Sequence, residues 1–224
     1  MNAYPDKELY TADDLVAIIA LLRDPEKGCP WDKVQTHQSI RMNFLEEAYE
    51  AVDAIDLEDP HLLCEELGDV MMQVAFHTQI AQEAGHFTWQ QVCDGVCRKL
   101  IERHPHIFGG DTSIKDWDAL KNKEKGRLTL QDDLASVPQA LPALMRAAKL
   151  QKRAARYGIQ VAADATAVAQ SAQTAQDTAD PQVAAQAVGQ MLFAAVALAR
   201  KAGVDPEEAL QQYNADFLVA PESH

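Results

Sequence analysis

Two pairs of acidic residues stand close together in the chain at a spacing typical of one helix face. The pairs are Glu47 with Glu50 and Glu66 with Asp69. Residues three or four positions apart project from the same side of a helix, so each pair sets two carboxylates side by side. A break at Glu58-Asp59-Pro60 separates the pairs and is short enough for an antiparallel helix hairpin. The sequence therefore predicts that four carboxylates meet across this hairpin.

Four carboxylates that face one another need a counter-charge. Without one they would repel one another and lose much of their hydration. Ligation by oxygen alone favours Mg²⁺ or Mn²⁺ over zinc or copper. A single Glu-x-x-Glu is usually just solvated surface, but two such pairs around a hairpin break are rarer, so we expect a metal site. Gly68 costs the helix about 1 kcal/mol relative to Ala, which suggests close approach by another backbone or a ligand.

The elements that would position these acids are helices. Hydrophobic residues make up 47% of the chain and aromatic residues only 6%, which suits an all-α protein built on Ala and Leu. Apolar spacing, caps and glycines predict helices at 11–23, 40–57, 61–84, 88–104, a segment containing Trp117 and Lys121, 141–157, 181–202 and 206–218. The expected buried stripe of the 61–84 helix consists of Leu63, Leu67, Val70 and Val74.

The domain organisation follows from a polar, proline-containing stretch in the middle of the chain. We expect a first domain at 1–126, a connector at 127–145 and a second domain at 146–224. Residues 161–187, rich in Ala, Gln, Thr and Asp, are only weakly amphipathic and are left without a helix up to residue 180. The first domain therefore holds both acidic pairs.

Charge and composition limit the partners. A net charge of −14 over 224 residues argues against binding a nucleic-acid polymer, which needs a basic surface. A small anionic substrate would need metal ions or a local cluster of Lys and Arg. No apolar run of roughly 18 residues predicts a membrane span, and no secretory signal is visible. The four cysteines follow no disulfide framework, so we expect a cytoplasmic protein without a membrane partner.

Basic and aromatic residues at helical spacing could contact an anionic ligand. Lys99 and Arg103 are four residues apart, as are Trp117 and Lys121, which suggests phosphate and base contacts. Cations near a helix C-terminus are also favoured by the helix dipole alone. Trp31 lies in a loop with two prolines, where a tryptophan more often closes a core edge than stacks on a ligand.

The second half of the chain repeats the pattern of the first without its acids. Glu66-Leu67-Gly68-Asp69 matches Ala187-Val188-Gly189-Gln190 in apolar pattern and glycine position, and the two runs end at Gly85 and Gly203. We interpret the second half as a degenerate helical repeat. It can pack, but it cannot hold an ion.

Together these motifs resemble the MazG-type nucleoside triphosphate pyrophosphohydrolases, an all-α family. The resemblance is strongest from Leu22 to Lys125. It rests on Arg23-Asp24-Pro25-Glu26-Lys27-Gly28-Cys29-Pro30-Trp31-Asp32, Glu46-Glu47-x-x-Glu50, Glu66-x-x-Asp69, Arg103-His104-Pro105-His106-Ile107-Phe108 and Trp117-x-x-x-Lys121.

The resemblance implies a dimer of helical-bundle subunits that hydrolyses nucleoside triphosphates to monophosphate and pyrophosphate with Mg²⁺, in nucleotide-pool house-cleaning. It implies metal ligation by Glu47, Glu50, Glu66 and Asp69, and orientation of the attacking water by Glu46 or Glu65. Triphosphate and base would be held by Lys99, Arg103, Trp117 and Lys121, with Trp31 as a further substrate-binding candidate.

Two departures from the family pattern keep an alternative open. Two-domain members carry the signature in both halves, whereas here only the first half has it, and Leu62 stands where the family has a Lys that reaches the substrate. The alternative is a non-catalytic nucleotide-binding or interaction protein. A ferritin-like di-iron bundle is disfavoured because such sites pair Glu with His at i+3, where this chain has Asp69. Base and sugar preference stay open.

Overall fold

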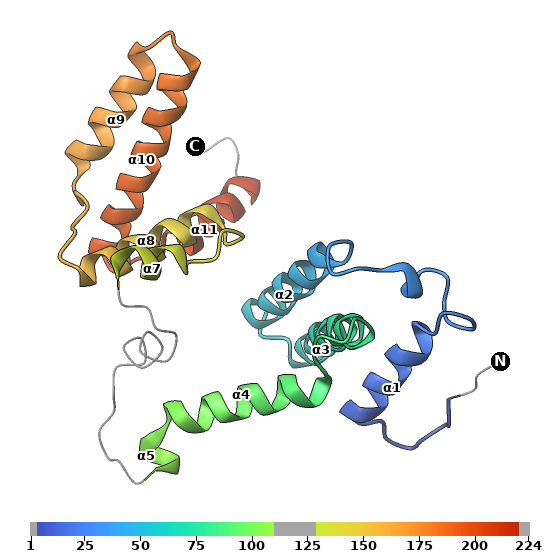
Figure 1. Ribbon diagram of the computed structural model, residues 1–224. Helices are drawn as coiled ribbons and strands as arrows, with labels where there is room; N and C mark the ends of the chain where they lie inside the picture. Colours follow the sequence, from blue (N-terminus) through green and yellow to red (C-terminus); the bar gives the residue numbers. More distant parts are fainter. Residues whose placement is uncertain (1–3, 110–128, 220–224) are drawn as a thin grey trace. The chain divides into compact units, whose positions relative to one another are not determined.

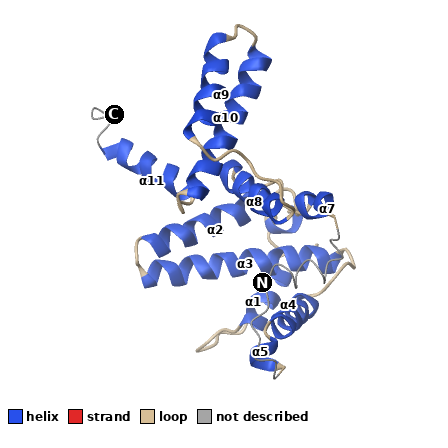
Figure 2. Cartoon of the chain, turned by 90° about the vertical axis from the view of Figure 1, so that its left-hand side faces the viewer, coloured by secondary structure: helices blue, strands red, loops and turns tan. Residues whose placement is uncertain are grey.

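The computed structural model describes residues 4–109 and 129–219 of the chain. Each of these ranges belongs to a compact unit of its own, and the two units are described separately. Every regular element in the described ranges is a helix, as Figures 1 and 2 show. The all-α prediction is therefore confirmed.

The described part of the first unit, residues 4–109, contains five α-helices and one short 3₁₀ segment. They are α1 (Ala12–Leu22), the 3₁₀ segment Asp32–Val34, α2 (Arg41–Asp56), α3 (Pro60–Glu83), α4 (Trp89–Arg103) and α5 (Pro105–Phe108). The four longest begin and end within one residue of the sequence-based ranges, and side-chain caps mark the starts of three of them, α1, α3 and α4. Thr11 and Thr88, for example, each form a capping box at the N-terminus of a helix.

The α2–α3 hairpin is specified by its turn. Glu58 adopts a positive φ of 54°, and the side chain of Asp59 caps α3 by accepting from the backbone N–H groups of His61 and Leu62. Pro60 occupies the first helical position, where its missing N–H is not needed. Along the hairpin, the small side chains of Ala51 and Ala54 are buried on α2, which lets the two helices approach closely.

The core of the first unit lies where α1 packs against α3. It is formed by Ile19, Ile40, Ala75 and Phe76, with Met72, Ile80 and Trp89 among the residues packed around it. The expected stripe on α3 was partly wrong, because Leu67 is 53% exposed and the buried positions of this helix are Gln73, Ala75, Phe76, Thr78 and Ala81. α3 therefore turns a different face to α1, and leaves apolar residues near its N-terminus in contact with solvent.

Arg23 joins the loop after α1 to the far end of α3. Its guanidinium Nη1 donates to the backbone oxygens of Asp32, at 2.6 Å, and Gln35, at 3.1 Å. The same guanidinium lies over the ring of Phe76. Gly28 completes the loop, because a Cβ there would lie 2.4 Å from the carbonyl oxygens of Leu22 and Asp24. The loop that carries Trp31 is thus firmly attached.

The second unit contains α7 (Leu130–Ala135), α8 (Ala143–Arg156), α9 (Ala165–Asp177), α10 (Pro181–Lys201) and α11 (Pro206–Val219). Helix α7 and the start of α8 occupy the expected connector, and α9 occupies a stretch for which no helix was predicted. Asp133 of α7 is fully buried and pairs with Arg153 of α8 at 3.1 Å. The basic residues of α8 are thus partly used within their own unit.

The two units share an order of helices and of contacts. In the first, α3 packs against α2, α1 and α4, and in the second, α10 packs against α9, α8 and α11. Asp180 and Pro181 begin α10 as Asp59 and Pro60 begin α3, with the Asp side chain as the cap. Gly85 and Gly203 follow these two helices with φ values of 71° and 75°. These parallels support the interpretation of a repeat.

Helix α10 is the one described helix that is long and apolar enough to cross a membrane, with a mean hydropathy of 1.5. Three glutamines, Gln182, Gln186 and Gln190, interrupt its apolar sequence. The same composition is typical of a helix at the centre of a helical unit, and α10 packs against three others.

Candidate active site

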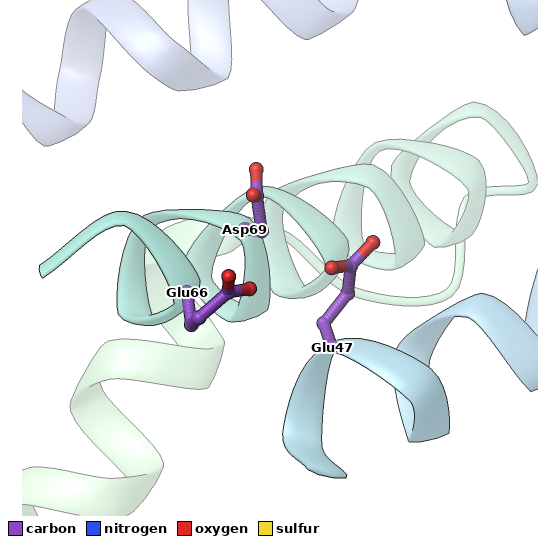
Figure 3. Close-up of side chains that lie close together, drawn as sticks. All are labelled: Glu47, Glu66 and Asp69. Atoms are coloured by element: carbon purple, nitrogen blue, oxygen red, sulfur yellow. The ribbon is translucent and has the colours of Figure 1, made fainter. Parts of the chain in front are cut away.

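Three of the four predicted ligands form a carboxylate cluster on the α2–α3 hairpin. Glu47 comes from α2, and Glu66 and Asp69 come from α3; one oxygen of each lies within 4.8 Å of the others. Figure 3 shows Glu66 and Asp69 rising from successive turns of α3, with Glu47 reaching toward them from α2. All three residues are half-buried. The hairpin therefore brings the acids together as expected.

The position of the turn determines which residues of α2 and α3 face each other. Glu47 precedes Glu58 by eleven residues and Asp69 follows it by eleven. In an antiparallel pair, residues equally far from the turn lie opposite each other, so Glu47 faces Asp69. Glu66 lies three residues before Asp69 and shares its side of α3.

Glu50, the fourth predicted ligand, is exposed and lies at the edge of the cluster. Burial is the main cause that raises the pKa of both Glu47 and Glu66; the carboxyl group of Glu50 adds slightly to the first shift and, through a hydrogen bond, slightly opposes the second. Glu50 is therefore close to both residues, although it is outside the group whose oxygens all lie within 4.8 Å of one another.

The electrostatics of the cluster suit a bound cation. Burial, more than any other cause, raises the pKa of Glu47 and of Glu66, and repulsion from Asp69 adds to both shifts. Among residues 4–109 and 129–219, no Lys or Arg forms an ion pair with the three acids. Oxygen ligands of this number, half-buried and without a counter-charge, fit a hard divalent ion.

The two residues predicted to orient water, Glu46 and Glu65, are exposed neighbours of the cluster. Each precedes a cluster member by one residue and so leaves its helix in a different direction. The nearby carboxylate of Glu65 also raises the pKa of Glu66, although less than burial and the charge of Asp69 do. Their role in handling water stays a prediction.

Three of the five predicted substrate contacts, Trp31, Lys99 and Arg103, lie on other segments of the first unit. Trp31 is 57% exposed, so it does not close a core edge as a loop tryptophan usually would. Lys99 is half-buried and Arg103 is 6% exposed, both on α4. Figures 1 and 2 agree that α4 runs across α3 and not alongside it. Trp117 and Lys121 lie outside the described residues.

The structure also shows the surroundings of Leu62 and Gly68, two positions that the sequence analysis singled out. Leu62 is half-buried in the first turn of α3. A Cβ at Gly68 would meet no described atom within 4 Å, so no backbone from the other described segments approaches that glycine. The close approach that the sequence suggested at Gly68 is therefore not made by the described parts of the same molecule.

Gln73 is a site residue whose contact the sequence did not reveal. It lies one turn beyond Asp69 on the same face of α3, and its amide Nε2 donates to Glu47 Oε1 at 3.3 Å. The spacing of Glu66, Asp69 and Gln73 indicates that they share one face of α3. The contact with Glu47 could not be predicted in the same way, because it depends on how α2 and α3 align in the hairpin.

The same face of α3 continues to His77, which packs and does not join the carboxylates. Its ring stacks on His37 at 5.2 Å between centroids, and the two Nδ1 atoms are 2.9 Å apart. Phe44 meets the ring edge-on at 5.7 Å. His77 therefore packs against other aromatic side chains.

The chain is similar to known proteins over most of its length. Residues 35–108, which include the whole cluster, match the model of the MazG nucleotide pyrophosphohydrolase domain. A nucleoside triphosphate pyrophosphohydrolase from Escherichia coli (strain K12) is 39% identical, over 92% of this chain and 83% of its own length. A nucleoside triphosphate pyrophosphohydrolase/pyrophosphatase from Thermotoga maritima is 37% identical, over 92% of this chain and 82% of its own. This chain belongs to the MazG nucleotide pyrophosphohydrolase family.

Proposed function

We propose that this protein hydrolyses nucleoside triphosphates to nucleoside monophosphate and pyrophosphate, using Mg²⁺ or Mn²⁺ at the α2–α3 hairpin. The observation that carries the proposal is the cluster of Glu47, Glu66 and Asp69, whose oxygens lie within 4.8 Å of one another. The relatives are named for this reaction. Family membership and the geometry of the acids therefore point the same way.

The residues divide the work as follows. Glu47, Glu66 and Asp69, with Glu50 at the edge, would hold the metal, which supplies charge neutralisation at the phosphoryl oxygens and an activated water. Glu46 or Glu65 would orient that water. Substrate would be bound by Trp31, Lys99, Arg103, Trp117 and Lys121.

The protein would act as a homodimer in the cytoplasm, in house-cleaning of the nucleotide pool. Support for the dimer comes from apolar side chains of the hairpin that are 37–53% exposed, namely Leu45, Tyr49, Val52, Leu67 and Met71. An apolar surface of this kind on a helical unit is typical of a protein interface. Light scattering coupled to size-exclusion chromatography tests the oligomeric state.

A second candidate function is nucleotide binding without turnover. It is favoured by Leu62, which replaces a cationic side chain of the family pattern, and by the second hairpin, where Ala187 and Gln190 stand in place of acids. Such a protein would bind nucleotide saturably in calorimetry but release no pyrophosphate.

One experiment separates the two candidates. The protein is incubated with each ribo- and deoxyribonucleoside triphosphate, with Mg²⁺ or with EDTA, and pyrophosphate is measured. We expect metal-dependent release that Glu66→Gln reduces to the level seen in EDTA. Glu208→Gln, an exposed acid of α11, is the matched control and keeps wild-type activity. Binding without metal-dependent release, or equal release from Glu66→Gln, would favour the non-catalytic alternative.

A further inference from the structure

Gln73 is the most buried polar residue beside the carboxylate cluster. Only 7% of its surface is exposed, although it lies on the same face of α3 as Glu66 and Asp69. Amide side chains are mostly found at the surface, and a buried one needs partners for both its donor and its acceptor atoms. Its position therefore calls for a specific contact.

The donor side of the amide has such a contact. Nε2 lies 3.3 Å from Glu47 Oε1 across the hairpin. The orientation of the amide follows from chemistry, since a carboxylate only accepts hydrogen bonds and the opposite orientation would set two acceptors against each other. Gln73 thus holds one oxygen of the single cluster member that comes from α2.

The acceptor side of the amide has no partner in the part of the chain that the structure describes. Gln73 Oε1 is buried and accepts no hydrogen bond within the described residues. An unpaired buried acceptor lowers the stability of the fold, so Met or Leu would suit a side chain that only filled the core better than Gln. A donor that enters the cluster, such as a water on a bound cation, would satisfy this oxygen.

We propose that Gln73 is a positioning residue of the metal site, which holds the Glu47 carboxylate toward Glu66 and Asp69 through its amide N–H and offers its Oε1 to a donor inside the site. This inference rests on the proposed function, because it concerns the same cluster. Residues that orient a ligand from outside typically change metal affinity 10–100-fold when they are removed. Gln73 is therefore a determinant of affinity and not a ligand.

The test measures Mn²⁺ binding directly, by the loss of the electron paramagnetic resonance signal of free Mn²⁺. Gln73→Met keeps the length and packing of the side chain but removes the amide, and Gln73→Asn keeps the amide but shortens its reach. Gln82→Met makes the first of these changes at an exposed position of the same helix and serves as control. Circular dichroism without metal confirms that each variant is folded.

The dissociation constant for Mn²⁺ should rise by about tenfold or more in Gln73→Met and Gln73→Asn and stay at the wild-type value in Gln82→Met. A folded Gln73→Met or Gln73→Asn that binds Mn²⁺ as tightly as wild type would overturn the inference and leave the proposed function standing. Wild-type protein that binds no Mn²⁺ would instead overturn the proposed function and the inference with it.

Discussion

The guanidinium of Arg23 donates two hydrogen bonds to the carboxylate of Glu83, from Nη2 to Oε2 at 2.7 Å and from Nε to Oε1 at 3.0 Å. Burial raises the pKa of Glu83, but the hydrogen bonds from Arg23 and Gln79 outweigh it and leave that pKa below its usual value. Since the Arg23 side chain is only 5% exposed, this pair ties the loop after α1 to the end of α3.

Replacing Arg23 by Met should lower the free energy of unfolding by about 2 kcal/mol, because the backbone oxygens of Asp32 and Gln35 and the partly exposed Glu83 carboxylate lose their donor. Arg98→Met is the matched control. Arg98 pairs with Asp94 at 2.7 Å, but both side chains are more than half exposed. Its removal should cost less than about 0.5 kcal/mol. Urea unfolding followed by circular dichroism measures both, and equal losses would contradict the structural role given to Arg23.

The metal-free protein should lose stability at its acid cluster as the pH rises. Burial raises the pKa of Glu47 and Glu66 in the folded state, and Asp69 adds to it, so folding favours their protonated forms. That contribution is fully present below the ordinary value of 4.5 and is lost as the pH rises through the folded-state pKa.

Glu66→Gln removes this repulsion. In EDTA at pH 7.5 the variant should therefore melt at a higher temperature than wild type, and at pH 4 the difference should shrink. Mg²⁺ should raise the melting temperature of wild type and not that of the variant, because only a bound ligand stabilises the fold. Scanning calorimetry checks both, and a variant less stable than wild type in EDTA would argue against a repulsive cluster.

The His37–His77 stack should make the first unit sensitive to mild acid. Burial, followed by the neighbouring His37, lowers the pKa of His77 below its ordinary 6.5. The stabilising contribution of a neutral His77 is therefore present above pH 6.5 and lost as the pH falls through the folded-state pKa.

His77→Phe keeps an aromatic ring against Phe44 but leaves His37 Nδ1 without its partner. It should cost about 1 kcal/mol at pH 7.5 and reduce the loss of stability between pH 7.5 and 5.5. Urea unfolding at the two pH values measures this. An unchanged pH dependence in His77→Phe would place the acid sensitivity elsewhere.

Gly68 offers a test of what approaches the hairpin from outside. A Cβ at this position would meet nothing within the described part of the chain, and Ala is better than Gly inside a helix. Gly68→Ala should therefore raise the free energy of unfolding by roughly 0.5–1 kcal/mol. A loss of stability, measured together with the oligomeric state, would show that a second copy packs tightly against this glycine.

Much of the hairpin was predictable from the sequence because its signals are local. The helix limits, the turn at Glu58 to Pro60 and the joint face of Glu66 and Asp69 all depend on residues a few positions apart. Even the meeting of Glu47 with Asp69 follows from counting outward from the turn. Rules that concern residues close together in the sequence were therefore sufficient to predict the acid cluster.

What could not be predicted depends on packing between elements. Helix α9 lacks a strong apolar stripe, so its 165–177 range read as weakly structured, although α10 covers it in the fold. The exposure of Leu67 depends on which face of α3 meets α1. The contact between Gln73 and Glu47 requires the hairpin register and the depth of each side chain together.

The parallel between the two helical hairpins has an evolutionary consequence. Helix α10 keeps the Asp cap, the first-turn Pro and the packing order of α3 with Ala187 and Gln190 at the positions of Glu66 and Asp69, so this scaffold forms without the acids and without their charge repulsion. A duplicated unit of this design is therefore free to drift from chemistry to a purely architectural duty, since selection for folding does not protect the reactive groups.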